Sequence, residues 1–389
     1  MKATALSVLL ALGAGSAHAQ VQGAAFGFAT GTTGGGDAQP QAPASLEELT
    51  AWITDDTPRT ILLDRTWDFA GTEGTTDGKC CSTDTTTCES GTSAGQAWIQ
   101  DSCDDGTWVE CKYDNAARTP LEVGSNKSIV GVGSEGVLKG KGLRVTKGNT
   151  NVIIQNIHIT DLNPQYVWGG DAITLDDTDQ VWVDHNKISL IGRQFIVSGW
   201  GKAGHVTISN NEFDGVTEWS SGCNGKHYWT ALLIGEDDQY TFSGNWLHDV
   251  SGRAPHMGTD KTKSGIFFHA VNNYFQNIGG HAFDIDTNTW SLLEGNYFEK
   301  VDTPLTETSL ASGALLFNVP DETAAGACEA AVGYVCEWNR VDEGSGEWTA
   351  KTDQDVLDRA GEFKESLVEH YGVAEVPKKV VANAGVGKL

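Results

Sequence analysis

Five aspartates and one arginine lie within a stretch of thirty residues, Trp168 to Val197, in the middle of the chain. They are Asp171, Asp176, Asp177, Asp179, Asp184 and Arg193. Carboxylates that converge can hold a hard cation such as Ca²⁺. Two carboxylates can also act as acid and base on a glycosidic bond. A third interpretation is structural, because aspartates at chain bends accept hydrogen bonds from the backbone.

The local pattern assigns most of these aspartates to structure. Asp176, Asp177 and Asp179 stand together at an expected bend, and Asp184 lies within a strand pattern, so we expect all four to be structural. The glycosidase interpretation resembles the polygalacturonases, which pair such carboxylates with downstream Ser-His-Gly and Arg-Ile-Lys tripeptides. Neither tripeptide occurs here. Asp171 and Arg193 are left as the candidates for chemistry.

The elements that must position them follow a repeat of short strands. Apolar residues alternate and an asparagine stands at the sixth place of each copy. The copies are VWVDHNKI (181–188), VTISNNEF (206–213), YTFSGNWL (240–247), FHAVNNYF (268–275) and SLLEGNYF (291–298), with a weaker VIIQNIHI from 152. Repeats of this length indicate stacked coils in which each coil contacts only its neighbours.

The repeat predicts an all-β fold, a single-stranded right-handed parallel β-helix with short capping helices. Strand-like alternation followed by a turn fits one face of a coil. The recurring asparagine can bond the backbone of the next coil and so form a ladder. A β-propeller is the alternative, but its blades need about forty residues and four strands each.

The open ends of a solenoid need caps. A capping box at Ser45 to Glu48 opens an amphipathic helix that carries Leu49 and Ile53, and we expect this helix to close the N-terminal end. Residues Val356 to Tyr371 have apolar side chains at helical spacing, which predicts a second helix packed outside or over the last coil.

The first nineteen residues have the layout of a secretory signal peptide, with an apolar run and an Ala-x-Ala site that ends at Ala19. We expect a secreted, soluble protein in which residues 20–389 form one catalytic β-helix domain. Within it, residues 80–111 form a disulfide-stapled loop region, and residues 353–389 form the C-terminal helix and tail. One glycosylation sequon stands at Asn126.

The eight cysteines of an exported chain predict disulfides rather than a metal site, because no zinc-type spacing occurs. Cys328 and Cys336 are close in sequence and we expect them to pair. The formal net charge of −26 makes nucleic acid and anionic membrane poor partners. It also repels a polyanionic substrate unless a cation bridges the charges or they are masked. We expect a monomer.

Several motifs resemble the polysaccharide lyases that cleave pectin. They are TGGG (33–36), KGKGLR (139–144), GGDAI (169–173), VWVDH (181–185), IGRQ (191–194), Cys223 with HYW (227–229), SGRAP (251–255) and HAVNNY (269–274). The resemblance spans about residues 22 to 340 and is weakest in the cysteine-rich loop. It implies β-elimination of a galacturonan, with endo action expected.

Two positions assign the chain to one branch of this family. Calcium-dependent pectate lyases carry acidic residues where this sequence has Gly169 and Arg193. The chain therefore resembles the fungal-type pectin lyases, which implies no metal and no cofactor. Their substrate, methyl-esterified pectin, is nearly neutral and suits the acidic chain. A calcium-dependent pectate lyase and a non-catalytic carbohydrate-binding β-helix remain the alternatives.

The resemblance also implies roles for single residues. Arg253 would be the base, Arg193 would stabilise the developing charge and tune the pKa of Arg253, and Asp171 would orient Arg193 or a substrate hydroxyl. Trp168, Tyr228, Trp229 and His256 would contact the substrate, with His256 standing where relatives carry lysine.

The resemblance implies disulfides as well. Cys88 would bond Cys223, and Cys103 would bond Cys80 or Cys81. Cys111 and the remaining one of these two stand outside the family pattern, and we expect them to pair with each other.

Overall fold

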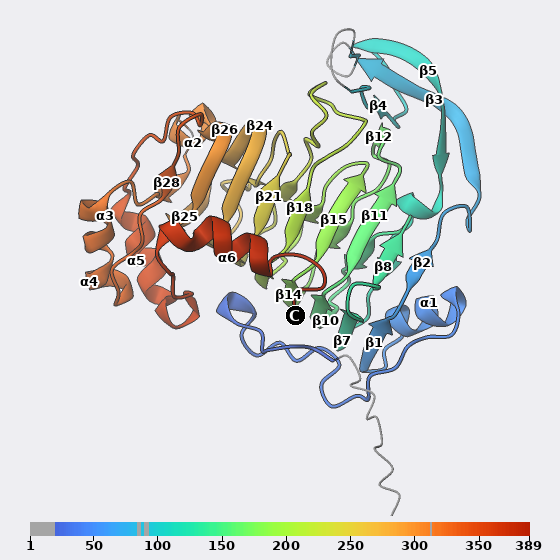
Figure 1. Cartoon of the computed structure of the whole chain (residues 1–389), viewed down its shortest axis with the longest axis horizontal. Helices are drawn as coiled ribbons and strands as arrows, with labels where there is room; N and C mark the ends of the chain where they lie inside the picture. The colour runs from blue at the N-terminus through green and yellow to red at the C-terminus, as the bar shows by residue number, and fades with distance from the viewer. Residues whose placement is uncertain (1–19, 84–86, 89–92, 312) are drawn as a thin grey trace, which may run out of the picture.

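The strand repeat folds into coils that stack side by side along one axis (Figure 1). The computed structural model describes residues 20–83, 87–88, 93–311 and 313–389. The signal peptide expected at residues 1–19 lies outside this range. Each complete coil contributes one strand to each of three faces, and neighbouring coils pair in parallel.

The first face is a sheet of nine parallel strands. In spatial order these are β1 (Arg59–Leu63), β7 (Lys127–Gly131), β10 (Thr150–Gln155), β14 (Asp179–Asp184), β17 (His205–Ser209), β20 (Gln239–Ser243), β23 (Ile266–Val271), β25 (Thr289–Glu294) and β27 (Leu315–Phe317). All five strong repeat copies begin on this face, so the alternating half of each copy is the strand that pairs here.

The second and third faces are joined by the long strand β24 (Tyr274–Ile285), which pairs with β21 through its first residues and with β22 through its last. The second face holds β2 (Thr66–Asp68), β8 (Val137–Lys139), β11 (His158–Leu162), β15 (Lys187–Ile191), β18 (Glu212–Asp214), β21 (Trp246–His248), β24, β26 (Tyr297–Leu305) and β28 (Arg340–Val341). The third face holds β6 (Leu121–Glu122), β9 (Leu143–Val145), β13 (Ile173–Leu175), β16 (Ile196–Ser198), β19 (Ala231–Leu233), β22 (His256–Met257) and the end of β24.

The core is built from like side chains stacked in register. One column on the first face runs through Val152, Val181, Val206, Tyr240 and Phe268, all of which are fully buried. Burial of such apolar side chains stabilises each coil by about 1.5–3 kcal/mol per residue. A parallel β-helix is therefore confirmed.

The recurring asparagines form the predicted ladder. The side-chain oxygen of Asn211 accepts the backbone N–H of Asn186 at 2.9 Å, and the oxygen of Asn245 accepts the backbone N–H of Asn211 at 3.0 Å. The same bond continues through Asn273 and Asn296 and reaches Asn339, which lies outside the repeat copies recognised in the sequence. The ladder satisfies buried backbone donors at the bend between the first two faces.

The N-terminal cap is confirmed. Helix α1 (Leu46–Thr54) begins at Ser45, whose hydroxyl accepts the backbone N–H of Glu48, while the Glu48 carboxylate accepts the N–H of Ala44. Leu49 and Ile53 are fully buried in the main core beneath the first coil.

The C-terminal prediction was wrong in its extent. Helix α5 (Gln354–Glu362) ends nine residues before Tyr371, and a second helix, α6 (Val376–Asn383), follows. A 3-10 turn follows α5 directly, and farther along, the chain is bonded to the β-helix wall, where the side chain of Asn272 accepts the backbone N–H of Tyr371 at 2.9 Å. The remaining helical segments are η1 (Gly27–Ala29), η2 (Ala116–Arg118), α2 (Glu307–Ala311), α3 (Glu322–Ala327), α4 (Glu329–Val332), η3 (Lys364–Ser366) and η4 (Val373–Glu375).

The cysteine-rich region forms an arm beside the stack, seen above β12 in Figure 1. It contains β3 (Thr75–Thr83), β4 (Ala97–Trp98) and β5 (Gly106–Asp114), which join β12 (Tyr166–Val167) in a small sheet. Four disulfides agree with the expected pairing: Cys80–Cys111, Cys81–Cys103, Cys88–Cys223 and Cys328–Cys336. The Cys88–Cys223 bond ties the arm to the third-face loops across 135 residues of sequence.

Two surface features concern the sequence predictions. The Asn126 side chain is half-buried and accepts a hydrogen bond from Asn151 at 2.7 Å, and Ser128 of the sequon is buried. Glycosylation of Asn126 stays a prediction. Among the residues that the structure describes, no helix has the length and apolar character needed to cross a membrane.

Candidate active site

The acidic stretch contains one aspartate at a surface cleft, three whose carboxylates bond within the fold, and Asp177, which is exposed. Asp176 accepts the backbone N–H of Gly201, and Asp179 accepts those of Gln180 and His205. Asp184 is buried and accepts hydrogen bonds from Gln155, His185, Ser209 and Asn210. The carboxylates of these three aspartates are used within the fold, as the sequence predicted.

Asp171 forms a two-point ion pair with Arg193. The guanidinium donates through Nε to Oδ1 at 2.8 Å and through Nη2 to Oδ2 at 2.6 Å, and the backbone N–H of Gln194 also donates to Oδ1. Both residues stand just before strands of the third face, on neighbouring coils. The planar fork of arginine matches a carboxylate in this way, which fixes the guanidinium in one orientation.

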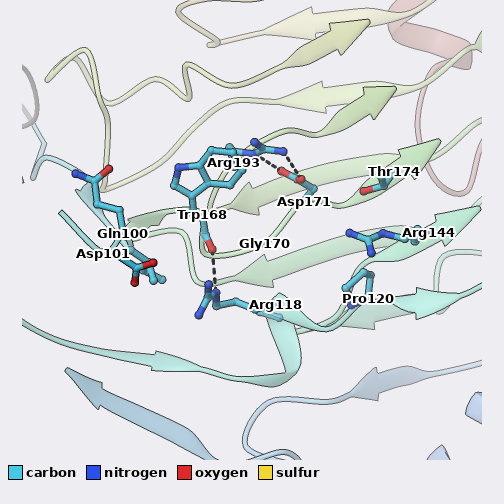
Figure 2. A pocket seen from close by; sticks show the side chains of 12 residues that line it. Gln100, Asp101, Arg118, Pro120, Arg144, Trp168, Gly170, Asp171, Thr174 and Arg193 are labelled. Atoms are coloured by element: carbon cyan, nitrogen blue, oxygen red, sulfur yellow. Dashed lines mark hydrogen bonds and ion pairs between the residues drawn. The ribbon is translucent and has the colours of Figure 1, made fainter. Parts of the chain in front are cut away.

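Trp168 covers the other side of the same guanidinium. The Cζ atom of Arg193 lies 3.7 Å from the Trp168 ring centroid, and only 14 % of the Arg193 side chain is exposed. Trp168 itself is 45 % exposed, so its outer ring face is open to a ligand. Figure 2 shows the pair at the wall of a cleft of about 430 Å³. Its lining is Ile99, Gln100, Asp101, Ala117, Arg118, Pro120, Arg144, Trp168, Gly170, Asp171, Thr174 and Arg193.

Arg253 stands before strand β22, three coils along from Asp171 on the third face. Its backbone has a φ of 48°, a left-handed conformation that a non-glycine residue rarely adopts. Its N–H donates to Nε2 of His281 at 3.0 Å, which holds the turn. A side chain at Gly252 would meet the Tyr228 ring at 2.5 Å, so the glycine permits close approach at this point.

The surroundings of Arg253 lower the pKa of its guanidinium. Burial is the largest cause, and the positive charge of Arg193 acts in the same direction, while Tyr228 and Asp284 oppose it. Both effects disfavour the protonated form. The expectation that Arg193 tunes the pKa of Arg253 therefore agrees in direction, although burial contributes more.

The expected aromatic contacts divide into exposed and buried ones. Trp229 is only 8 % exposed, with the Arg253 guanidinium 4.7 Å above its ring and Gln96 bonded to its indole nitrogen. Trp229 therefore supports Arg253 from below instead of offering a free face to sugar, contrary to the expected substrate contact. Tyr228 is half-buried, with its ring edge-on to Trp229, and Trp168 remains the exposed platform.

His256 lies on the third face beside the paired residue Asp284 of β24. Its Nδ1 lies 2.6 Å from Oδ2 of Asp284, which leaves Nε2 toward solvent, and the side chain is 26 % exposed. Burial alone would raise the pKa of Asp284, but the hydrogen bond and charge of His256 lower it. The bond to Asp284 fixes the orientation of the His256 ring on the third face.

A divalent cation does not fit at Asp171. The Arg193 fork takes both carboxylate oxygens, and a guanidinium beside them repels a metal ion. Elsewhere in the described part of the chain, Glu212, Asp214 and His248 bring three donor atoms together. The Lys187 ammonium lies 2.8 Å from both of these carboxylates and already compensates their charge.

His227 anchors the loop that carries Arg193. It is 3 % exposed, stacks on Phe195 at 4.3 Å, and its Nε2–H donates to the carbonyls of Arg193 and Trp229 at 2.8 and 3.1 Å. Burial lowers the pKa of His227 to about 4, and the two carbonyls offset this only in part. The neutral ring is therefore the form that the fold requires.

We expect His227 to make the fold less stable in acid. Because its folded pKa lies below the unfolded value of 6.5, stability is fully present above pH 6.5 and falls as the pH drops toward 4, by roughly 3 kcal/mol. The variant His227→Gln keeps a donor but does not titrate. The difference in unfolding free energy between wild type and variant, from urea titrations, should fall across this range. A constant difference would contradict the assignment.

Some residues of the site carried little signal in the sequence. Arg144 ends the KGKGLR motif, so that motif could have placed it at the cleft, whereas nothing marked Arg118. Gln96, in the arm, accepts a hydrogen bond from the Trp229 indole. His281, on β24 of another coil, accepts the backbone N–H of Arg253. These contacts depend on how coils of unequal length stack.

Comparison with known proteins assigns the family. A family model described as pectate lyase matches residues 105–312. The chain is 76 % identical over 389 residues to probable pectin lyase F-1 of Aspergillus terreus, with all of both chains covered. It is 73 % identical over 390 residues to probable pectin lyase E of Aspergillus fumigatus, again over the full length of both.

Solved structures agree in fold. Pectate lyase II of Xanthomonas campestris superposes with a TM-score of 0.57 at 21 % identity, covering 94 % of this chain and 98 % of its own. Pectate lyase C of Erwinia chrysanthemi gives a TM-score of 0.54 at 19 % identity, covering 94 % and 96 %. At these identities the likeness concerns the β-helix alone. The full-length relatives decide the branch: the chain belongs to the pectate lyase family and, within it, to the fungal pectin lyases.

Proposed function

We propose that this protein is a secreted pectin lyase that cleaves methyl-esterified α-1,4-galacturonan by β-elimination, within the polymer, as a monomer and without calcium. Residues 20–389 form its single catalytic domain. The observation that carries the proposal is the Asp171–Arg193 pair, in which a guanidinium occupies both carboxylate oxygens. A fixed positive charge of the protein thus stands where a bridging cation would be needed for a free uronate.

Arg253 is the base of the proposed reaction. Its neutral guanidine takes the proton from carbon 5 of the sugar, the bond between carbon 4 and oxygen 4 breaks, and the departing oxygen takes up a proton. The product carries a double bond between carbons 4 and 5. Support comes from the lowered pKa of Arg253, caused by burial and by Arg193, since a base must be able to lose its own proton.

Arg193 stabilises the negative charge that develops on the ester carbonyl when the carbon 5 proton leaves. Asp171 and Trp168 hold its guanidinium from two sides, so it needs little reorganisation during the reaction. Methyl ester groups make the carbon 5 proton more acidic than a carboxylate does. They also remove most of the repulsion between the polymer and a chain of net charge −26.

Trp168 and Tyr228 contact the sugar rings, and His256 directs its free Nε2 at the same surface. An aromatic face that is half exposed beside the charged pair suits the apolar face of a sugar and of its methyl ester. Trp229 acts on the substrate only through Arg253, which lies on it.

The decisive experiment compares two substrates and the effect of a chelator. Ultraviolet absorbance follows the unsaturated product from highly methylated pectin and from polygalacturonate, each with and without chelator. We expect turnover of methylated pectin that persists after chelation, because no acidic cluster at Asp171 can hold calcium.

Two outcomes would contradict the proposal. Activity confined to polygalacturonate and abolished by chelator would indicate a calcium-dependent pectate lyase. Binding of pectin with no unsaturated product from either substrate would indicate a non-catalytic carbohydrate-binding β-helix.

A further inference from the structure

The cleft beside the Asp171–Arg193 pair contains two more arginines that the proposed chemistry does not use. Arg118 and Arg144 line it together with Trp168 and Arg193, as Figure 2 shows. The chain has twice as many acidic as basic residues, 52 against 26. Asp101 and Asp171 also line the cleft, so its three arginines leave one positive charge in excess. In a chain of net charge −26, this local field attracts negative groups of a ligand.

Arg118 is exposed and held in place, yet its charge is not neutralised. Its Nε donates to the carbonyl of Trp168 at 3.2 Å, and its guanidinium lies 5.1 Å from the Tyr113 ring centroid. Within the described ranges, no carboxylate forms an ion pair with it. A guanidinium that is oriented by neutral groups is ready to bind an anion at little entropic cost.

Arg144 projects outward from β9 on the third face, where it is paired in register with Glu122 and Thr174 of the neighbouring strands. Its Nη1 lies 3.5 Å from Glu122, but this carboxylate also has Lys147 at 3.7 Å. Its Nε is buried and has no hydrogen-bond partner in the described structure. Because the Arg144 side chain is 43 % exposed and shares Glu122 with Lys147, its guanidinium can also bind an anionic ligand.

These two arginines lie at a fixed separation from the proposed base. Strand β9 is four strands from β22 across the third face, which corresponds to about 19 Å at ~4.8 Å per strand. A galacturonan that crosses the strands from Arg253 past Trp168 would bring a more distant sugar to Arg118 and Arg144.

We propose that Arg118 and Arg144 form a subsite for a free, unesterified galacturonate carboxylate, several sugars away from the methylated residue that reacts. This inference rests on the proposed function and refines its substrate. An ester at the scissile position favours elimination, and a carboxylate at the subsite pairs with the two guanidinium groups. A methyl ester there carries no charge, so its carbonyl oxygen accepts only weaker hydrogen bonds from the two guanidinium groups.

The test measures kcat/KM on nearly fully methylated and on half-methylated pectin for wild type, Arg118→Gln and Arg144→Gln. In each of the two variants we expect the ratio of half-methylated to fully methylated kcat/KM to fall roughly tenfold, the effect of losing one charged hydrogen bond. The matched control is Arg359→Gln on α5, because Arg359 is 40 % exposed and paired with one carboxylate, much as Arg144 is 43 % exposed beside Glu122. This control should leave the ratio unchanged.

A second readout separates this inference from the proposed function. Saturated, unesterified oligogalacturonate in the presence of chelator is titrated by calorimetry into wild type and variants. We expect weaker binding by roughly tenfold in Arg118→Gln and Arg144→Gln. Binding that both variants keep at wild-type strength would overturn the subsite, as would equal losses on both pectins. Absence of elimination in wild type with arginine-dependent oligogalacturonate binding would instead reject only the lyase proposal.

Discussion

Arg253→Ala is expected to lower kcat on methylated pectin by roughly 2–4 orders of magnitude, the usual effect of removing a positioned proton acceptor. Substrate affinity should change little, because the exposed face of Trp168 and the Asp171–Arg193 pair lie on other coils and remain in place. The measurement is steady-state kinetics from the absorbance of the unsaturated product, with circular dichroism to confirm folding.

A matched variant distinguishes the base from a merely positive residue. Arg253→Lys keeps a cation over the Trp229 ring but lacks the planar fork, so it should restore only a small part of the lost turnover. The backbone at Arg253 is left-handed, and neither replacement is a glycine, so we expect both variants to keep the same strain. Near-normal turnover in folded Arg253→Ala would move the base elsewhere, and His256, with its free ring nitrogen, would be the next residue to replace.

Arg193→Ala is expected to lower kcat roughly 10²–10³-fold, as the loss of one preorganised charge-stabilising donor does in other enzymes. Arg193→Lys should recover part of this loss, since it restores the charge but not the two-point contact with Asp171. Equal kinetics for Arg193→Lys and wild type would show that the fork has no role.

The two arginines should also be linked in their pH dependence. Arg193 contributes to the lowered pKa of Arg253, so its removal raises that pKa. Because the neutral guanidine is the reacting form, the rising limb of kcat against pH should move to higher pH in Arg193→Ala. Arg359→Gln, far from the cleft, serves as a control that removes one positive charge. If the rising limb of kcat against pH does not move in Arg193→Ala, burial alone lowers the pKa of Arg253.

Much of the fold could be predicted from the sequence because each coil of a β-helix repeats the same pattern of strand and turn. The Asn186, Asn211 and Asn245 positions recur with apolar neighbours, and each does the same task in successive coils. The capping box at Ser45 could also be predicted, because its two hydrogen bonds join residues only three and four apart in the sequence. Such local patterns need no knowledge of the rest of the chain.

The C-terminal helix shows where local reading failed. Helical spacing continues past Glu362, but the last part of this segment bonds to the wall of the stack, as Tyr371 does to Asn272. Trp229 failed for a related reason. The resemblance implied a substrate contact for Trp229, but the arm places Trp98 against its ring and Gln96 at its indole nitrogen.

The sequence by itself determined the repeat, the β-helix, the family resemblance and the identity of Asp171, Arg193 and Arg253, because these depend on residue type and short-range spacing. Only the tertiary structure decided which charges meet. Coils of unequal length bring residues twenty to thirty apart onto adjacent strands, so the Asp171–Arg193 fork, the Trp229 support and the free charge of Arg118 depend on register. The register between coils is set by the packing of the whole stack, so it cannot be derived from any single sequence motif.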